Sequence, residues 1–544
     1  MNTSSAPTPV VIGVIDDGLA FAHERFRKVV NHLVETRIEH CWIQDGASKG
    51  APSPVPYGRE LRKAEIDPLL AECTRAGAVD EDLIYRKAGL IDFRQYGHKS
   101  AAWRASHGTH VMDLACGFEP GQAQPEHLII CVQLPTRVTA ATSGAGLYPY
   151  VFDAITYILA CTAAISKERG LPHLPVVINL SYGRLAGPHD GTLNLERAID
   201  NIVAKCAARG VSLQVTLPAG NSYLSRCHAQ ISFQRRGQTK TLRWRVLPDD
   251  QTPSFLEIWM PARGAGSVGS RIQIRITSPT GESRTIDETI GAVRWGPGNQ
   301  VYAKASYSIA SASQRGVFSV ALAPTFQLDP NKSLAPCGIW TLEVKNLMLS
   351  RKDIPQAWIQ RDDSLYGFPI KGRQSHFDEP CYEHYDHAGR DNEVDDPDCK
   401  VRREGTINGI ATGEYPIVIG GYLKREMVAA NYSAAGVSGP VGSSPRSPDA
   451  MAVSEDSRVR RGILAAGTRS GSVVAIGGTS AAAPQVARWC AFELAAGNPG
   501  DRASVQAKAT HDEANHPAGT PAAPSYQRGG KGRLELPSPH PLKR

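Results

Sequence analysis

The sequence predicts an α/β protein in which a doubly wound parallel sheet is interrupted by an inserted all-β sandwich. Two observations support this prediction. Apolar runs of strand length alternate with helical segments in residues 1–227 and again in residues 405–500, which is typical of βαβ units. Between them, residues 228–360 contain short alternating segments separated by turn residues, which is typical of an antiparallel sandwich.

The first 227 residues contain most of the predicted parallel sheet. Residues 9–16 are an unbroken apolar run that ends in Asp-Asp-Gly, and this pattern predicts a strand buried on both faces. Residues 44–105 are polar and irregular, so we interpret them as an insertion with one helix near residues 67–75. The alternation that follows predicts helices from about residue 108, at 148–169 and at 193–209, and strands at 127–134, 176–181 and 211–217.

The remaining segments complete the domain plan. Residues 361–404 are polar, and we expect them to form a linking loop. Residues 501–544 are polar and rich in Pro and Gly, which predicts a mostly flexible tail with one possible strand at 532–536. A strand at 415–420 and a helix near residue 480 are expected to complete the parallel-sheet domain, and the sandwich strands are expected at 241–246, 255–260, 271–276, 301–308, 316–322 and 339–344.

The composition indicates an ordinary globular protein. Its 544 residues include 60 Lys and Arg and 53 Asp and Glu, and the net charge of +7 is mild and spread along the chain, so we expect neither nucleic acid nor a membrane as a partner. No run approaches the roughly 20 apolar residues of a membrane span, and the N-terminus lacks a signal core. Eleven cysteines, mostly in apolar contexts, indicate buried free thiols and therefore a cytoplasmic location.

Three short segments carry reactive side chains where predicted strands end or helices begin. Catalysis by a serine nucleophile needs a base that takes its proton and a carboxylate that orients this base. Asp, His and Ser occur here in that order. Small residues around the serine leave room for a substrate backbone, and the following helix adds positive partial charge for an oxyanion. The segments are Asp16-Asp17-Gly18, Ser106-His107-Gly108-Thr109-His110 and Gly478-Thr479-Ser480-Ala481.

Each segment alone has a common structural explanation. Gly-Thr-Ser before a helix is more often a cap, Asp at a strand end is usually a turn residue, and His before Gly is structural about as often as it is catalytic. An esterase of the α/β-hydrolase kind would need G-x-S-x-G and the order Ser, Asp, His, whereas Ala482 stands two positions after the serine here and the order is Asp, His, Ser. The joint pattern and its order therefore favour a catalytic role over these structural explanations.

The three segments resemble the catalytic signatures of the subtilases, the subtilisin-like serine peptidases. This resemblance implies a subtilisin-like fold and a triad in which Asp16 orients His107, His107 acts as general base and Ser480 is the nucleophile. His110 matches a position that packs beneath the site. The implied activity is that of a serine endopeptidase.

A fourth position of the family stabilises the oxyanion with an Asn side chain. The segment Leu217-Pro218-Ala219-Gly220-Asn221 is similar to it, so the resemblance implies that Asn221 has this role together with the backbone N–H of Ser480. The alternative is that Gly220-Asn221 is merely a turn. Loss of such a donor typically lowers the rate by about 100- to 1,000-fold.

The resemblance also implies an extended peptide substrate. The segment containing Ser181, Tyr182 and Gly183 is similar to the family's strand that pairs with the substrate backbone. Together with Ala219 and Gly220, it would form the walls of the pocket for the residue before the scissile bond. Neither wall contains a carboxylate. Asp190 could approach from a neighbouring loop, although a turn is the more common role for such a residue.

Asp17 occupies the variable position of its motif, where most subtilases carry Ser or Thr. Asp-Asp-Gly is instead similar to the kexin and furin branch, in which the second aspartate faces the substrate residue two before the cut. The resemblance therefore implies a preference for Lys or Arg at that substrate position, worth on the order of 1 kcal/mol if Asp17 is exposed. A turn role for Asp17 before Gly18 is the alternative.

The chain departs from secreted subtilases at its N-terminus and in its insertion. Only fifteen residues precede Asp16, so we expect no inhibitory prosegment and hypothesise gating by a protein partner or by the inserted regions, as in the effector of a multicomponent bacterial system. The insertion resembles the jelly-roll domain of Csp-type bacterial subtilases. The alternative function is a catalytically silent subtilase-like scaffold that binds peptides or partner proteins.

A cluster of potential metal ligands lies in residues 376–399. Cys and His would suit zinc and the carboxylates would suit calcium, but Cys381 and Cys399 lack the close pairing of a zinc site. We therefore predict a solvated polar loop with no metal site. The predicted mechanism requires no cofactor, and structural calcium is possible. The cluster comprises His376, Asp378, Cys381, His384, Asp386, His387, Asp391, Asp395, Asp396 and Cys399.

Overall fold

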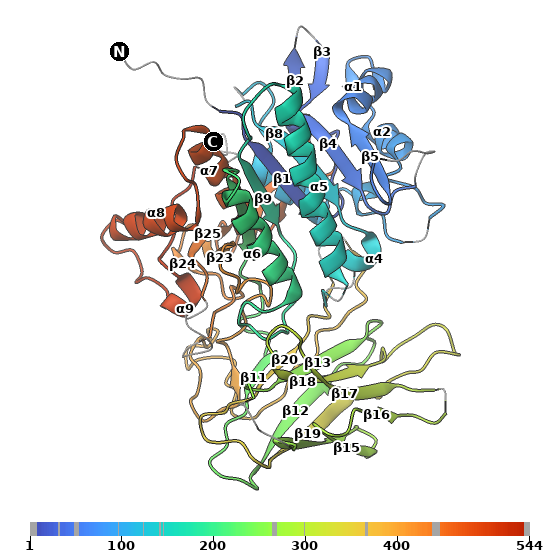
Figure 1. Ribbon diagram of the computed structural model, residues 1–544, viewed down its shortest axis with the longest axis vertical. Coiled ribbons are helices and arrows are strands. Elements are labelled where there is room, and N and C mark those ends of the chain that lie inside the picture. The colour runs from blue at the N-terminus through green and yellow to red at the C-terminus, as the bar shows by residue number, and fades with distance from the viewer. Residues whose placement is uncertain are drawn as a thin grey trace.

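The chain consists of a parallel-sheet domain and an antiparallel sandwich that lies below it in Figure 1. This arrangement confirms the predicted fold class. The computed structural model describes residues 8–30, 33–47, 54–95, 97–122, 125–140, 143–144, 146–263, 269–298, 300–364, 368–437 and 447–537.

The main sheet has nine strands in the order β24, β23, β10, β9, β1, β8, β4 and β5, with β25 beside β23. Its pairs are parallel except β4 with β5 and β23 with β24. The five predicted strands are present as β1 (Val11–Asp16), β8 (Leu128–Gln133), β9 (Val176–Leu180), β10 (Leu213–Pro218) and β23 (Ile417–Leu423). The sequence pattern missed β4 (Ile38–Ile43), β5 (Arg59–Arg62), β24 (Val428–Ala429) and β25 (Ala450–Glu455).

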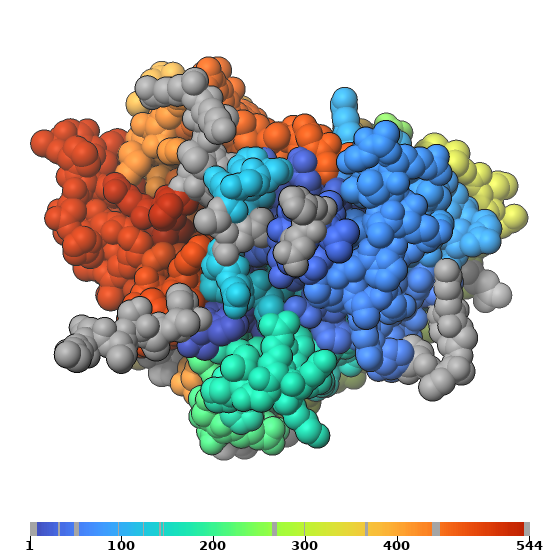
Figure 2. All heavy atoms as spheres, turned by 90° about the horizontal axis from the view of Figure 1, so that it is seen from above, coloured from blue at the N-terminus to red at the C-terminus, as the bar shows by residue number. Residues whose placement is uncertain are grey.

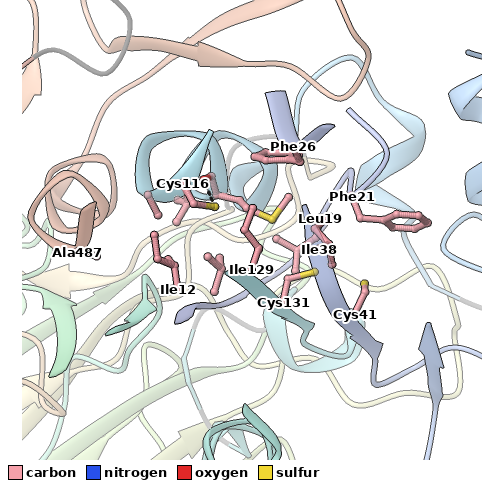
Figure 3. Close-up of a cluster of buried hydrophobic side chains, with 14 of the residues drawn as sticks. Ile12, Leu19, Phe21, Phe26, Ile38, Cys41, Cys116, Ile129, Cys131 and Ala487 are labelled. Carbon is pink, nitrogen blue, oxygen red and sulfur yellow. Dashed lines mark hydrogen bonds between the residues drawn. The ribbon is translucent and has the colours of Figure 1, made fainter. Parts of the chain in front are cut away.

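Helices cover both faces of this sheet, as the unbroken apolar strands predict. On one face, Val11 and Ile130 pack beneath α5 (Leu147–Glu168) and α6 (Asn194–Ala207). On the other, Ile12 and Ile129 pack towards α3 (His107–Cys116) and α7 (Thr479–Ala495), which contribute Cys116 and Ala487 to the cluster in Figure 3. The alternation along each strand thus supplies two cores.

Helix α5 is long and apolar enough to cross a membrane by length and composition, with a mean hydropathy of 1.3. Its apolar residues Val151, Ile155 and Ile158 are buried against the sheet. The described residues contain no other helix that meets this test. The apolar face of α5 is therefore explained by its place in the core.

The expected irregular insertion at residues 44–105 is more ordered than predicted. It contains α1 (Lys63–Glu72), in place of the helix expected slightly later, and α2 (Glu81–Ala88). Ile66 and Tyr85 are fully buried in the core beside the main sheet, so this region extends the domain. The nearby short elements are η1 (Glu24–Phe26), β2 (Arg27–Val30), β3 (Leu33–Thr36), β6 (Thr74–Arg75), β7 (Ala78–Val79), η2 (Ser100–Ala102) and α4 (Thr136–Thr139).

The sandwich consists of one seven-stranded and one five-stranded antiparallel sheet around a core that includes Trp244, Trp295, Trp340 and Trp358. The first sheet has the order β16 (Ala292–Trp295), β17 (Ala303–Ile309), β18 (Gly316–Leu322), β13 (Ser254–Trp259), β20 (Gln356–Ile359), β11 (His228–Gln230) and β22 (Val401–Arg402). The second has the order β15 (Ser283–Asp287), β14 (Ile272–Thr277), β19 (Gly338–Asn346), β12 (Thr239–Val246) and β21 (His376–Phe377).

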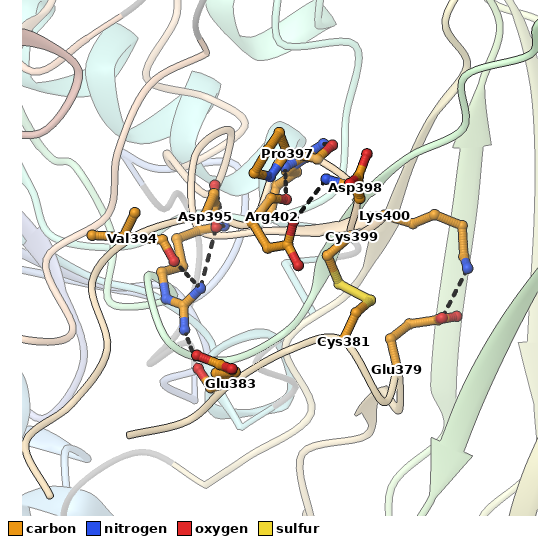
Figure 4. Close-up of a disulfide and its surroundings, with 12 residues drawn as sticks. Glu379, Cys381, Glu383, Val394, Asp395, Pro397, Asp398, Cys399, Lys400 and Arg402 are labelled. Carbon is orange, nitrogen blue, oxygen red and sulfur yellow. Dashed lines mark hydrogen bonds and ion pairs between the residues drawn. A yellow bond between two sulfur atoms is a disulfide. The ribbon is translucent and has the colours of Figure 1, made fainter. Parts of the chain in front are cut away.

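The predicted linking loop at residues 361–404 is therefore partly wrong, because β21 and β22 lie within it and belong to the two sheets. The prediction that the cysteines are free thiols is also wrong in this segment. Cys381 and Cys399 form a disulfide, shown in Figure 4 beside the Glu379–Lys400 ion pair. The other nine cysteines are unpaired, and seven of them are buried.

The expected flexible tail is also wrong for most of its length. Asp501 caps α8 (Arg502–Ala514) by accepting the Ser504 N–H at 2.9 Å, and Arg533, almost fully buried, pairs with Glu513. Leu534 is fully buried and donates its N–H to Met451 O at 2.7 Å. The red C-terminal segments thus cover one side of the domain in Figure 2. The remaining elements are β26 (Ile463–Ala466), β27 (Val473–Ile476) and α9 (Tyr526–Gly529).

Replacement of Leu534 by Ala tests whether the tail is part of the fold. Since Leu534 is fully buried, the variant is expected to lower the free energy of unfolding by about 2 to 5 kcal/mol, as is usual for buried Leu. Urea denaturation measures this change. Leu328→Ala is the matched control, because Leu328 is 87% exposed; equal stability of the two variants would contradict docking of the tail.

Candidate active site

The end of β1 and the start of α3 bring Asp16 and His107 together. The His107 Nδ1 atom lies 2.7 Å from Asp16 Oδ1, and both side chains are buried. The Asp17 N–H also donates to Asp16 Oδ1 at 2.8 Å. These bonds hold the imidazole in one orientation and favour a proton on Nδ1, which leaves Nε2 free to accept a proton.

Glycine after His107 allows this close approach. A Cβ atom on Gly108 would lie 1.8 Å from the Asp17 carbonyl oxygen and 3.0 Å from Asp16 Cβ. Any side chain at this position would therefore push α3 away from the end of β1. His110, one helical turn further, is fully buried, and its Nε2 lies 2.8 Å from Ile463 O, which agrees with its predicted packing position.

The charges around His107 favour its protonated form, whereas burial alone would disfavour it. Burial lowers the pKa of His107, but the charge of Asp16 and its hydrogen bond outweigh burial, and the net pKa is raised above the ordinary value. Asp17 adds to this effect. An imidazolium formed at His107 during a reaction would thus be stabilised by the buried carboxylate.

Ser480 lies in the first turn of α7, where backbone N–H groups have no carbonyl partner four residues earlier in the helix. It is 9% exposed, and its carbonyl accepts the Ser181 hydroxyl at 3.2 Å. His107 and Ser480 line the same cleft. Within the described part of the chain no hydrogen bond joins these two side chains, and bonds of this kind commonly tighten only when substrate binds.

Asn221 lies beside Ser480, and its amide nitrogen lies near the serine hydroxyl. Its Oδ1 accepts the Thr479 N–H at 2.9 Å and the Thr479 hydroxyl at 3.0 Å, which leaves Nδ2 as the available donor. A Cβ atom on Gly478 would lie 3.1 Å from Asn221 Nδ2 and 3.3 Å from Ser480 Oγ. The amide donor and the hydroxyl therefore converge on one side of the cleft.

The cleft has a volume of about 180 Å³ and passes between the two predicted wall segments. Ser181, Tyr182 and Gly183 line one wall, and Gly220 lines the other. Ala219, predicted as a wall residue, is fully buried, and its N–H donates to Ile419 O at 2.8 Å. Ala219 therefore supports the wall from behind instead of facing the cleft.

Asp17 does not face the cleft, which contradicts its predicted contact with substrate. It is 2% exposed, and its Oδ1 accepts the Gly108 N–H at 3.2 Å. Burial and the neighbouring charge of Asp16 raise the pKa of Asp17 to about 7. The position of α3 against the end of β1 encloses this side chain. The similarity of Asp16-Asp17-Gly18 to the kexin branch therefore does not extend to an exposed carboxylate at Asp17.

The structure adds three residues that the sequence pattern did not indicate. Arg361, just beyond β20 of the sandwich, and Asn408, from the segment that returns to the main sheet, both line the cleft. Tyr432 accepts the Gly478 N–H at 2.8 Å and donates to Glu455 at 2.8 Å, so it fixes the loop before Ser480. None of the three lies in a recognisable motif, and only tertiary structure brings them to the site.

Several members of the polar cluster at residues 376–399 form arginine pairs or the disulfide. Asp378 pairs with Arg245, and Asp395 pairs with Arg403. Among the described residues, groups able to hold a metal occur elsewhere: Asp16, Asp17 and His107 at the site, and His40, Glu60 and Cys161 near β4 and β5. Asp190 likewise pairs with Arg315 at 2.9 Å and does not line the cleft.

Comparisons with known proteins identify the architecture. No protein-family profile and no curated protein sequence matches the chain. Among solved structures, the CspB protease of Clostridium perfringens matches with 19% identity over 98% of this chain and 94% of that chain, with a TM-score of 0.65.

Two further solved structures match less well. The epidermin leader peptide processing serine protease of Staphylococcus aureus is 11% identical over 98% of this chain and 76% of that chain, with a TM-score of 0.35. A cold-adapted subtilisin-like serine proteinase is 11% identical over 95% and 88% of the two chains, with a TM-score of 0.33. The match to CspB, which includes the sandwich within its coverage, confirms the predicted resemblance at the level of architecture: this chain has the subtilisin-like fold.

Proposed function

We propose that the chain is a serine endopeptidase in which Asp16, His107 and Ser480 form the catalytic triad. The observation that carries this proposal is the buried hydrogen bond of 2.7 Å between Asp16 and His107, next to a cleft that His107 shares with Ser480 and Asn221. The subtilisin-like fold supports it, because the fold brings three distant segments of the chain to one cleft.

In the proposed mechanism, His107 Nε2 takes the proton of Ser480 Oγ as this oxygen attacks the peptide carbonyl carbon. The imidazolium then gives the proton to the leaving amine, and water hydrolyses the acyl-enzyme by the reverse proton transfers. Asp16 keeps the tautomer of His107 and stabilises its charged form. Asn221 Nδ2, the backbone N–H of Ser480 and the positive end of α7 stabilise the oxyanion.

The proposed substrate is a peptide that binds as an added strand along Ser181, Tyr182 and Gly183. Backbone hydrogen bonds would supply affinity, and the pocket between the walls would supply selectivity. The triad provides both the nucleophile and the base, so the proposed reaction requires no cofactor. A structural calcium ion is compatible with this mechanism.

We propose a cytoplasmic location and control by a partner or by the inserted regions. Seven buried thiols among the eleven cysteines support the location. The side chain of Arg361 supports control by the insertion, because it follows β20 of the sandwich and lines the cleft with His107. Binding of a partner to the sandwich would therefore act on the cleft at the position of Arg361.

Control of this kind predicts that the purified chain alone cleaves unfolded proteins slowly. Hydrolysis of several unfolded proteins, followed by mass spectrometry of new termini, measures this activity, and addition of cell extract is expected to raise it. Robust cleavage of many unfolded proteins by the purified chain would contradict control by a partner or by the insertion.

Covalent labelling distinguishes the peptidase from the alternative, a silent scaffold that binds peptides or partners. A fluorophosphonate is expected to label the wild-type chain and to leave Ser480→Ala unlabelled, because the reagent bonds to an activated serine oxygen. Ser311→Ala is the control, since Ser311 is exposed and outside the cleft. Absence of wild-type labelling under every activating condition would favour the scaffold.

The pH dependence tests the role of Asp16. The base must be neutral, so kcat/KM is expected to fall as the pH drops through the raised pKa of His107. Asp16→Asn removes the charge that raises this pKa, and burial then lowers it, so the acid limb of the remaining activity is expected to move to lower pH. The rate itself is expected to fall by roughly 10,000-fold.

Peptide hydrolysis measured across the pH range provides this profile. Asp329→Asn is the control, because Asp329 is an exposed carboxylate of the sandwich. An acid limb that stays in place in Asp16→Asn would show that Asp16 does not set the pKa of the base.

A further inference from the structure

The segment that returns from the sandwich binds both walls of the cleft through its backbone. The Asn408 N–H donates to Ala219 O at 2.6 Å, and the next N–H, of Gly409, donates to Arg184 O at 2.6 Å. These two acceptors belong to opposite walls. Asn408 is therefore fixed between the walls, and its side chain is 7% exposed and lines the cleft.

The amide of Asn408 spans the distance between the walls. Its Nδ2 lies 3.4 Å from Tyr182 O on one wall and 3.5 Å from Pro218 O on the other. Its Oδ1 accepts the N–H groups of Arg184 at 3.2 Å and Ile410 at 3.3 Å. Since both carbonyl oxygens are within contact distance of one nitrogen, no side chain can pass between the walls at this level.

The Asn408 amide also contacts Gly183, which belongs to the backbone segment that would pair with substrate. A Cβ atom on Gly183 would lie 1.9 Å from Asn408 Nδ2 and 2.2 Å from its Oδ1. Gly183 is thus in direct contact with the amide, and only a glycine fits there. Displacement of the amide by a long substrate side chain would break its four polar contacts and leave buried groups unpaired.

We infer that Asn408 closes the pocket for the residue before the scissile bond and restricts that residue to Gly, Ala or Ser. This inference rests on the proposed peptidase function. Thr406 and Ser222 also line the cleft, and no carboxylate lines it among the described residues. A short, uncharged side chain ends above the amide, whereas Leu, Phe, Lys and Arg side chains extend into the space that it occupies.

Matched tetrapeptide substrates that differ only in this residue test the inference. The wild-type chain is expected to cleave after Ala with a kcat/KM at least about 10-fold higher than after Leu or Phe, a difference typical of a pocket that excludes added methylene groups. Asn408→Gly is expected to raise cleavage after Leu or Phe by about 10-fold or more and to change cleavage after Ala little.

Asn346→Gly is the matched control, because Asn346 is also a buried asparagine with an amide bonded to backbone, but it lies in the sandwich. Melting temperatures identify a variant that fails to fold, and Asn408→Ala then provides a second, milder opening of the pocket. Wild-type cleavage preferentially after Leu, Phe, Lys or Arg, or an unchanged preference in both variants, would overturn the inference.

Binding separates this inference from the proposed function. Calorimetry with peptide acids ending in Ala or Leu reports pocket size without turnover, and tighter binding of the Ala peptide by the wild-type chain is expected. Absence of fluorophosphonate labelling under every activating condition would overturn the peptidase proposal. Equal binding of the Ala and Leu peptides would overturn the role of Asn408 whether or not the chain is labelled.

Discussion

The candidate site depends on the buried hydrogen bond between Asp16 and His107. This bond forms only because the last residue of β1 and the first residue of α3 meet, and Gly108 permits that contact by lacking a Cβ atom. A carboxylate buried this deeply would be costly without partners. The Asp17 N–H and the imidazole are these partners. Asp16 is therefore compensated only where α3 packs against the end of β1, because this packing brings the imidazole to it.

The parts of the fold that were predictable share a local signal. Strands β1, β8, β9 and β10 are apolar runs buried on both faces, and their pattern is visible without knowledge of the neighbours. Helix α8 had a signal too, since Asp501 caps a segment with Val505 and Ala509 on one face. The surrounding Pro- and Gly-rich composition outweighed it in the sequence analysis.

The residues that were missed or misplaced depend on contacts between distant segments. Whether Asp17 is exposed depends on how α3 packs against β1, and the motif alone does not encode this packing. Asn408 follows the whole sandwich in the chain and carries no motif, yet it contacts Ala219 and Tyr182 across that separation. Residue type predicted the reactive groups, whereas tertiary structure decides which other groups surround them.

The sandwich is joined to the main domain by two chain segments, and both contribute residues to the lining of the cleft, namely Ser222, Thr406 and Asn408. One begins directly after Asn221, and the other ends at Asn408. The two segments that attach the insertion therefore lie next to Asn221 and Asn408, which line the same cleft. Under the proposed function, a protein bound to the sandwich would act on the cleft through these two segments, without competing with substrate.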